Sequence, residues 1–296
     1  MLINPTDWFQ NEEIQLRQVR SLEQNAFMTE IRRQVQSSPF NALLINVNGF
    51  RGRFPSALRK TAFVSHVLDI DAPVLAFDWP GNAGSTPRGY RRAQQVATES
   101  GAELAKAIST IIREIQPARL WLVANSMGAQ VVVHAFHILY QDADMADTPT
   151  EIENVVLTAP DVDKNGFDER FKREIAAIAT NLTVYVSSND RALLMSRVLN
   201  RGRRLGESTL DPSNPDQFGA AADIYELIGA GNPFITLVDV TPVNRTRNFH
   251  TFSLETQQFF DDLYLRLVNE QMPRSRPEYR VEVPNGSVYW VLTTGR

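Results

Sequence analysis

The most informative stretch of the sequence is residues 120–130, which read LWLVANSMGAQ. Leu120–Ala124 is continuously apolar, as is typical of a strand buried on both faces of a parallel sheet. Ala129–Tyr140 follows with a pattern typical of a helix. The stretch therefore predicts a strand, a tight turn around Ser126 and a helix.

Five further apolar runs predict the neighbouring strands of the same sheet. They are Ala42–Val47, Pro73–Phe77, Asn154–Thr158, Leu182–Val186 and Phe234–Val240. Stretches of helical period separate them, such as Glu103–Ile115, whose apolar residues fall on one helix face. Strands that alternate with helices predict an α/β fold, in which helices cover both faces of a mainly parallel sheet.

We expect three parts along the chain: an N-terminal helical extension over residues 1–39, a main α/β domain over 40–273 and a C-terminal β-hairpin over 274–296. Residues 7–36 lack Gly and Pro and predict one or two amphipathic helices. Residues 201–233 are rich in Arg, Gly and Pro, so we expect either a surface loop or a lid there.

The C-terminal hairpin is predicted by Asn285-Gly286, a dipeptide typical of a two-residue turn. It lies between two strand-like runs, Tyr279–Val283 and Ser287–Leu292. The edge of a sheet can pair with other chains unless it is covered. We therefore expect this hairpin at an edge of the sheet.

The composition excludes several classes of function. The 296 residues are 43% apolar and 22% charged, as in soluble globular proteins, and the net charge of −4 argues against a nucleic-acid partner. Without cysteine the chain can form neither a disulfide scaffold nor a thiolate metal site. No apolar stretch approaches the roughly 18 residues of a membrane span, and no secretory leader is apparent, so we expect a cytoplasmic protein.

Residues 124–128, ANSMG, are a variant of the G-x-S-x-G nucleophile elbow in which Ala124 replaces the first glycine. The serine of an elbow lies on a strained turn, so the residues two positions before and after it must be small. Ala124 and Gly128 meet this need, and the helix that begins beneath Ser126 favours negative charge developing there. A simple helix cap is the alternative interpretation, but the position between a strand and a helix favours a nucleophile.

A nucleophilic serine needs a base, and the base needs an acid that orients it. His250 lies in a polar loop after the last predicted strand, and functional groups gather at the carboxyl ends of the strands in an open α/β sheet. Asp190 follows Leu182–Val186 and is the favoured acid. Asp161 and Asp163, which follow the preceding strand, are the alternative acids. An Asx turn or a helix cap is the structural interpretation of any of these aspartates.

The oxyanion formed in such a reaction needs two positioned hydrogen-bond donors. We expect one to be the backbone N–H of Met127, directly after the serine. The other is the N–H of Phe50 in the turn Asn48-Gly49-Phe50, because Gly49 lets the backbone come close to a substrate. An ordinary glycine turn is the alternative interpretation.

The chain also contains a set of short motifs: VNGF (47–50), DWPG (78–81), ANSMG (124–128), TAPDVD (158–163), SSNDRAL (187–193) and a histidine after the strand with VDV. Each is weak alone, but as a set they resemble an uncharacterised group of bacterial α/β-hydrolases, over about residues 40–270. The resemblance implies an α/β-hydrolase fold and a serine hydrolase with Ser126, Asp190 and His250 as its triad. Asn48 and Asn125 stand where the group usually has histidine.

The candidates for substrate contact are Asn48, Gly49, Asn125, Arg51 and Arg88. The two arginines follow the loops after the first and second strands and suit an anionic substrate group, with solvated surface residues as the alternative interpretation. No phosphate-loop, dinucleotide-binding or zinc-peptidase motif is present, so we expect neither a cofactor nor a metal.

These patterns predict a serine hydrolase, and more narrowly an esterase that acts on a small-molecule carboxylic ester through an acyl-enzyme. An acyltransferase or an amidase would use the same triad, because the shape of the pocket chooses the acceptor. A non-catalytic scaffold of the same fold, which binds a ligand or a partner, is the alternative from another class. The oligomeric state is not predicted.

Overall fold

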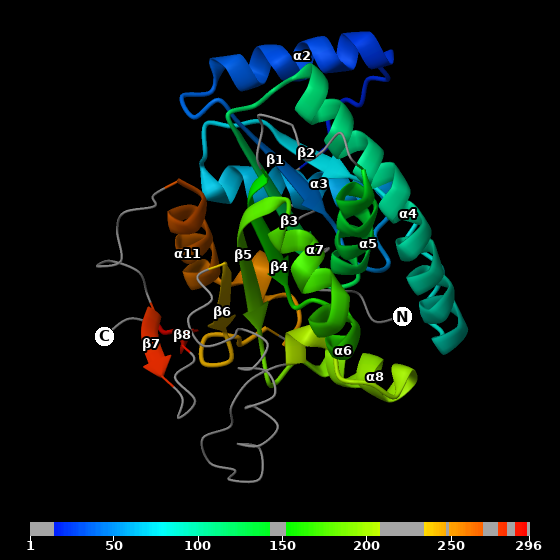
Figure 1. Cartoon of the computed structure of the whole chain (residues 1–296), viewed down its shortest axis with the longest axis vertical. Coiled ribbons are helices and arrows are strands. Elements are labelled where there is room, and N and C mark those ends of the chain that lie inside the picture. The colour runs from blue at the N-terminus through cyan, green and yellow to red at the C-terminus, as the bar shows by residue number, and fades with distance from the viewer. Residues whose placement is uncertain are drawn as a thin grey trace.

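The structure is a computed structural model that describes residues 15–142, 152–207, 234–246, 249–268, 278–282 and 288–294. Within these ranges eight strands form one sheet, in the order β2-β1-β3-β4-β5-β6-β8-β7 (Figure 1). Every neighbouring pair is parallel except β7 and β8, which are antiparallel. The strands are β1 (Ala42–Val47), β2 (Val74–Phe77), β3 (Arg119–Asn125), β4 (Ile152–Thr158), β5 (Ala179–Val186), β6 (Ile235–Asp239), β7 (Glu278–Glu282) and β8 (Val288–Leu292). The predicted α/β fold with a mainly parallel sheet is confirmed.

Helices connect the strands and cover the sheet. The described helices are α2 (Gln24–Ser37), α3 (Phe54–Leu68), α4 (Pro87–Glu114), α5 (Gly128–Gln141), α6 (Lys164–Gly166), α7 (Lys172–Ala176), α8 (Arg191–Asn200), α10 (Phe252–Glu255) and α11 (Gln257–Val268). A π-helical turn, Phe167–Phe171, joins α6 to α7, and a short 3-10 turn, Leu205–Glu207, follows α8. None of these helices is long and apolar enough to span a bilayer.

The apolar core has two parts, one on each face of the sheet. The strand period of two divides β1 between them: Leu43 and Ile45 pack with α4 and α5, whereas Leu44 packs with α3 and α11. Figure 1 shows α4 and α5 to the right of the strands and α11 to their left. A strand that is buried on both faces is apolar at most of its positions, which is why mainly apolar runs mark this sheet in the sequence.

The C-terminal strands extend this sheet. β8 lies parallel to β6, with Val238 opposite Trp290 and Asp239 opposite Val291, and β7 pairs with the other side of β8. The hairpin therefore takes the edge position that the sequence predicts, although its Asn-Gly turn lies outside the described residues. The division into three parts at residues 39 and 273 stays a prediction.

The predicted N-terminal helix is wrong for residues 15–23, which are not helical; α2 begins at Gln24. Leu16, Val19 and Leu22 are exposed, so a helix there would have no apolar partner on which to bury a face. Tertiary packing supplies most of the stability of a helix, and α2 has it through side chains such as Met28, which lies in the core. Residues 7–14 of the predicted helix lie outside the described residues. So do residues 208–233, which make up most of the predicted lid.

Candidate active site

Ser126 lies on the sharp turn between β3 and α5 with a left-handed backbone, at a φ of 52°. This conformation costs a non-glycine residue about 1–3 kcal/mol, and such strained residues cluster at active sites. A Cβ on Gly128 would lie 2.6 Å from the carbonyl oxygen of Val47, and a Cβ on Gly49 would lie 2.9 Å from the Cβ of Ser126. The turn is therefore built at close quarters against the segment that follows β1.

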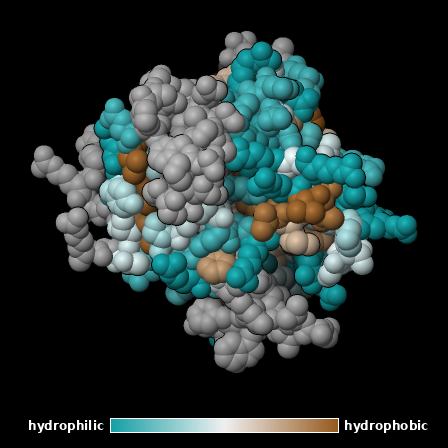
Figure 2. Space-filling view, turned by 90° about the horizontal axis from the view of Figure 1, so that it is seen from below, coloured by the Kyte–Doolittle hydropathy of each residue, from teal (hydrophilic) through white to brown (hydrophobic). Residues whose placement is uncertain are grey.

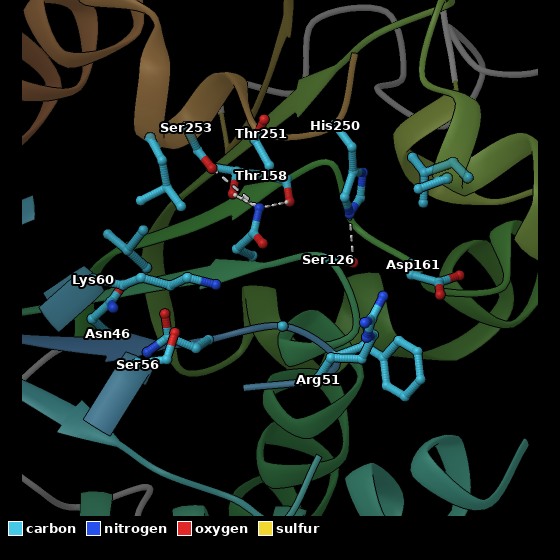
Figure 3. A pocket seen from close by; sticks show the side chains of 18 of the residues that line it. Asn46, Arg51, Ser56, Lys60, Ser126, Thr158, Asp161, His250, Thr251 and Ser253 are labelled. Atoms are coloured by element: carbon cyan, nitrogen blue, oxygen red, sulfur yellow. Dashed lines mark hydrogen bonds between the residues drawn. The ribbon is translucent and has the colours of Figure 1, made fainter. Parts of the chain in front are cut away.

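His250 joins this serine to Asp190. Its Nε2 lies 2.9 Å from the Oγ of Ser126, and its Nδ1 lies 2.6 Å from the Oδ2 of Asp190. Figure 3 shows the His250 ring directed at Ser126. Because a carboxylate only accepts hydrogen bonds, Nδ1 carries the proton, and Nε2 is left to accept from the serine hydroxyl. The three side chains come from the turn after β3, the start of α8 and the segment before α10.

Asp190 has two structural roles at once. Its Oδ1 accepts from the backbone N–H groups of Ala192 and Leu193, at 2.9 and 3.0 Å, and so caps α8. Its Oδ2 holds His250, and the side chain is fully buried. The helix-cap interpretation and the acid interpretation thus both apply to this one carboxylate.

The alternative acids have other partners. The carboxylate of Asp161 accepts a hydrogen bond from the hydroxyl of Tyr90 at 2.6 Å and another from Nε of Arg204 at 2.7 Å. Asp161 and Arg204 are both buried. Asp163 caps α6 through the N–H of Gly166 at 2.9 Å, and its side chain is half exposed. Neither forms a hydrogen bond with His250 in the part of the chain that the structure describes.

The surroundings of His250 set its affinity for a proton. Burial of the ring disfavours the charged form, but the charge and hydrogen bond of Asp190 outweigh it, so the pKa of His250 is raised above its ordinary value. The charge of Asp161 acts in the same direction, and that of Lys60 opposes it. The ring is therefore a stronger base than an isolated histidine.

The expected oxyanion donors lie beside Ser126. Met127 directly precedes α5, and Phe50 lines the same pocket as Ser126. Within the described ranges neither N–H donates a hydrogen bond to another residue. Both groups are available to a substrate oxygen, and their role stays a prediction.

A pocket of about 1100 Å³ opens over Ser126. Gly49 is among the residues that line it. The lining also includes five cationic side chains, Arg51, Arg53, Arg59, Lys60 and Arg191, and one carboxylate, that of Asp161. Because the whole chain has a net charge of −4, this concentration of positive charge is a property of the site and not of the composition. Arg88 is exposed in the first turn of α4 and is not among the residues that line this pocket, so the pocket gives its expected substrate contact no support.

The two asparagines also line the pocket, and each ties elements together. The amide of Asn125 donates to the hydroxyls of Thr158 and Ser253, both at 3.1 Å, which joins β3, β4 and α10. The amide of Asn48 lies 3.4 Å from the hydroxyl of Thr61 on α3. At both positions, 48 and 125, this chain therefore has the amide of an asparagine where the resembling hydrolase group usually has the imidazole of a histidine.

One rim of the pocket is apolar. α8 contributes Leu193, Met195 and Leu199 to the lining, and Met195 is 61% exposed. Figure 2 shows an apolar patch on the right of this face, in the region of α8, where Leu194 and Val198 are also exposed. Beyond Arg191 at its start, α8 therefore gives the opening an apolar stretch, whereas α3 contributes Arg59 and Lys60.

Sequence reasoning missed Lys60, Ser253 and the buried pair of Asp161 with Arg204. Asn46 also lines the pocket. The sequence could have indicated it, because this lone amide interrupts the apolar run of β1. Lys60 left no such signal, since a lysine on a surface helix is ordinary. Across the described residues no group of three or more His, Asp or Glu side chains is arranged to hold a metal ion.

The fold and this serine–histidine–aspartate arrangement define the class of α/β-hydrolases. The model of one family, described as alpha/beta hydrolase of unknown function (DUF900), matches residues 23–257, and the chain belongs to this family. The predicted resemblance to an uncharacterised α/β-hydrolase group is thereby confirmed.

Solved structures similar to this chain include two at low identity. An uncharacterized protein from Bacillus cereus ATCC 10987 is 13% identical with a TM-score of 0.44, over 88% of this chain and 68% of that one. An inhibited esterase B from Lactobacillus rhamnosis is 13% identical with a TM-score of 0.41, over 78% of each chain. No curated protein matches this sequence.

Proposed function

We propose that this protein is a serine hydrolase that cleaves a small-molecule carboxylic ester through an acyl-enzyme. The observation that carries the proposal is the chain of hydrogen bonds from Ser126 through His250 to Asp190 at the wall of an open pocket. A strained serine, a base within 2.9 Å of it and a buried acid that orients the base are the parts that nucleophilic catalysis requires.

The first half of the reaction forms the acyl-enzyme. The Oγ of Ser126 attacks the acyl carbon, and Nε2 of His250 takes the serine proton. The N–H groups of Met127 and Phe50 stabilise the oxyanion, and the imidazolium is stabilised by Asp190. When the tetrahedral intermediate collapses, His250 returns the proton to the leaving alkoxide, and the alcohol departs.

The second half restores the enzyme. Water attacks the acyl carbon, and His250 takes its proton and then returns it to the oxygen of Ser126. The sum is ester plus water giving acid plus alcohol, without a cofactor. An acyltransferase would differ only in using another alcohol or amine in place of water.

The direct test is covalent labelling with a fluorophosphonate, read by intact mass. We expect a single adduct on the wild type and none on Ser126→Ala. Ser56→Ala, a change of another serine that lines the same pocket, is the matched control and keeps the adduct. With 4-nitrophenyl acetate, turnover by Ser126→Ala falls at least about 10⁴-fold.

Two results would contradict the proposal. An adduct that persists on Ser126→Ala would place the nucleophile elsewhere. A folded wild type that neither takes the probe nor cleaves any ester would favour the non-catalytic binding scaffold.

A further inference from the structure

Cationic and polar groups converge on one side of the nucleophile. In the view of Figure 3, Lys60, Asn46 and Ser56 lie to one side of Ser126, and Asp161 lies to the other with α8. Lys60 extends from α3 into the pocket. We call this side of the pocket, between α3 and α10, the Lys60 arm.

The Lys60 arm has the composition of a site for a single negative charge. Hydroxyls and amides from five different elements line it, and they are Asn46, Ser56, Asn125, Thr158 and Ser253. Apolar side chains such as Val64 and Leu254 form the rest of its wall. A mostly apolar pocket with a few convergent polar groups is the usual form of a small-molecule site.

Lys60 differs from the arginines at the mouth. Arg51, Arg53 and Arg191 are exposed, so solvent and salt screen their charges. Lys60 is half-buried. Its charge acts on His250 and opposes the rise in the pKa of that ring that Asp190 causes. A charge in this position interacts with a bound anion more strongly than an exposed one does.

We infer that Lys60 binds a carboxylate of the substrate, and that the substrate is an ester with this carboxylate on one side of the scissile bond and an apolar group on the other. The carboxylate lies in the Lys60 arm, and the apolar group lies against α8 on the opposite side of Ser126. One ammonium among neutral hydroxyls and amides matches the single charge of a carboxylate better than the nearly double charge of a phosphate monoester. The inference rests on the proposed hydrolase function and names its substrate class.

The experiment uses two matched pairs of esters, so that the carboxylate is offered on either side of the bond. 4-Nitrophenyl hydrogen adipate is compared with 4-nitrophenyl hexanoate, and 4-(hexanoyloxy)benzoate with its methyl ester. We expect kcat/KM to favour the anion in at least one pair by about 10- to 100-fold, the range for a hydrogen bond to a charged group.

The variants assign this preference to one side chain. Lys60→Met abolishes the preference, which is taken as the ratio of kcat/KM for the anionic and neutral ester within each variant, so that a change in the pKa of His250 affects both esters alike and cancels. A urea-unfolding midpoint close to that of the wild type shows that the variant is folded. Lys60→Arg retains part of the preference. Lys106→Met, on an exposed position of α4, makes the same change of charge away from the pocket and leaves the preference intact.

Three outcomes would overturn the inference while leaving the hydrolase proposal standing. They are no preference for the anion in either pair, a preference that survives Lys60→Met, and a preference that Arg59→Met removes but Lys60→Met does not. Loss of the proposed function itself would look different, because the wild type would then cleave none of the four esters.

Discussion

Asp190→Asn separates the two roles of the buried carboxylate. Asparagine has the same shape, and its Oδ1 can still accept from the N–H groups of Ala192 and Leu193 that Asp190 caps. Its amide nitrogen then replaces the oxygen that lies 2.6 Å from Nδ1 of His250. Two donors would face each other there, so the ring must place its proton on Nε2 instead.

The size of the effect follows from this change of tautomer. A proton on Nε2 faces the Oγ of Ser126, so the ring can no longer take the serine proton. Loss of the orienting acid in such a triad lowers kcat about 10⁴-fold, equivalent to about 5.5 kcal/mol of transition-state stabilisation. The cap remains, so we expect the free energy of unfolding to change by no more than about 1 kcal/mol.

The assay measures kcat/KM with 4-nitrophenyl acetate and the free energy of unfolding in urea, on three variants. Asp161→Asn removes one partner of a buried ion pair with Arg204 and should cost about 3–5 kcal/mol of stability, but it keeps the contact between Asp190 and His250. Asp163→Asn changes a half-exposed side chain and should cost no more than about 0.5 kcal/mol. Activity within tenfold of wild type in Asp190→Asn, or a folded Asp161→Asn that is equally inactive, would refute this reasoning.

Three further predictions concern the pH dependence of activity, the pH dependence of stability and the glycine beneath the nucleophile. Since the pKa of His250 is raised above its ordinary value of 6.5 and catalysis needs the neutral ring, kcat/KM should rise with pH through a midpoint above 6.5; a midpoint below it would contradict the role of Asp190. By linkage, the stability that protonated His250 adds is fully present below about pH 6.5 and lost as the pH rises through the folded-state pKa, so His250→Gln should cost more stability at pH 6 than at pH 9 in urea unfolding. Gly128→Ala should destabilise by about 1–3 kcal/mol and lower activity, because the new Cβ lies 2.6 Å from a carbonyl oxygen of Val47. Gly166→Ala, where the nearest atom is 3.5 Å away, is the control, and an equal loss in both would refute the steric argument.

The sheet and the nucleophile turn could be predicted because their signals are local. Ala42–Val47 is apolar at every position except Asn46 and forms β1 with the predicted bounds, because a strand with helices on both faces buries nearly all of its side chains. The small residues around Ser126 are required by the turn itself, whatever the rest of the chain does. In the same way Asn285-Gly286 indicated a hairpin, and the strands beside it pair antiparallel.

The predicted helix over residues 7–36 shows where local signals are insufficient. Residues 15–23 and Gln24–Ser37 both carry spaced apolar side chains, but only the second segment has a core on which to place them. The register of β8 beside β6 was also beyond the sequence, because many apolar strands could have taken that edge. Pairing between strands depends on what the whole chain leaves uncovered.

By itself the sequence determined the residue types of the site and their order along the chain. Ser126 and His250 are 124 positions apart, and Asp190 and His250 are 60 apart, so the preference for Asp190 over Asp161 rested on the order of the strands and on the resemblance. The tertiary structure adds the contacts, since it directs Asp161 to Arg204 and Tyr90 and brings the second oxygen of Asp190 to the ring. It also decided that Lys60 faces the pocket. The physical reason is that propensity and periodicity act over a few residues, whereas a site is made by groups that meet only when the sheet has formed.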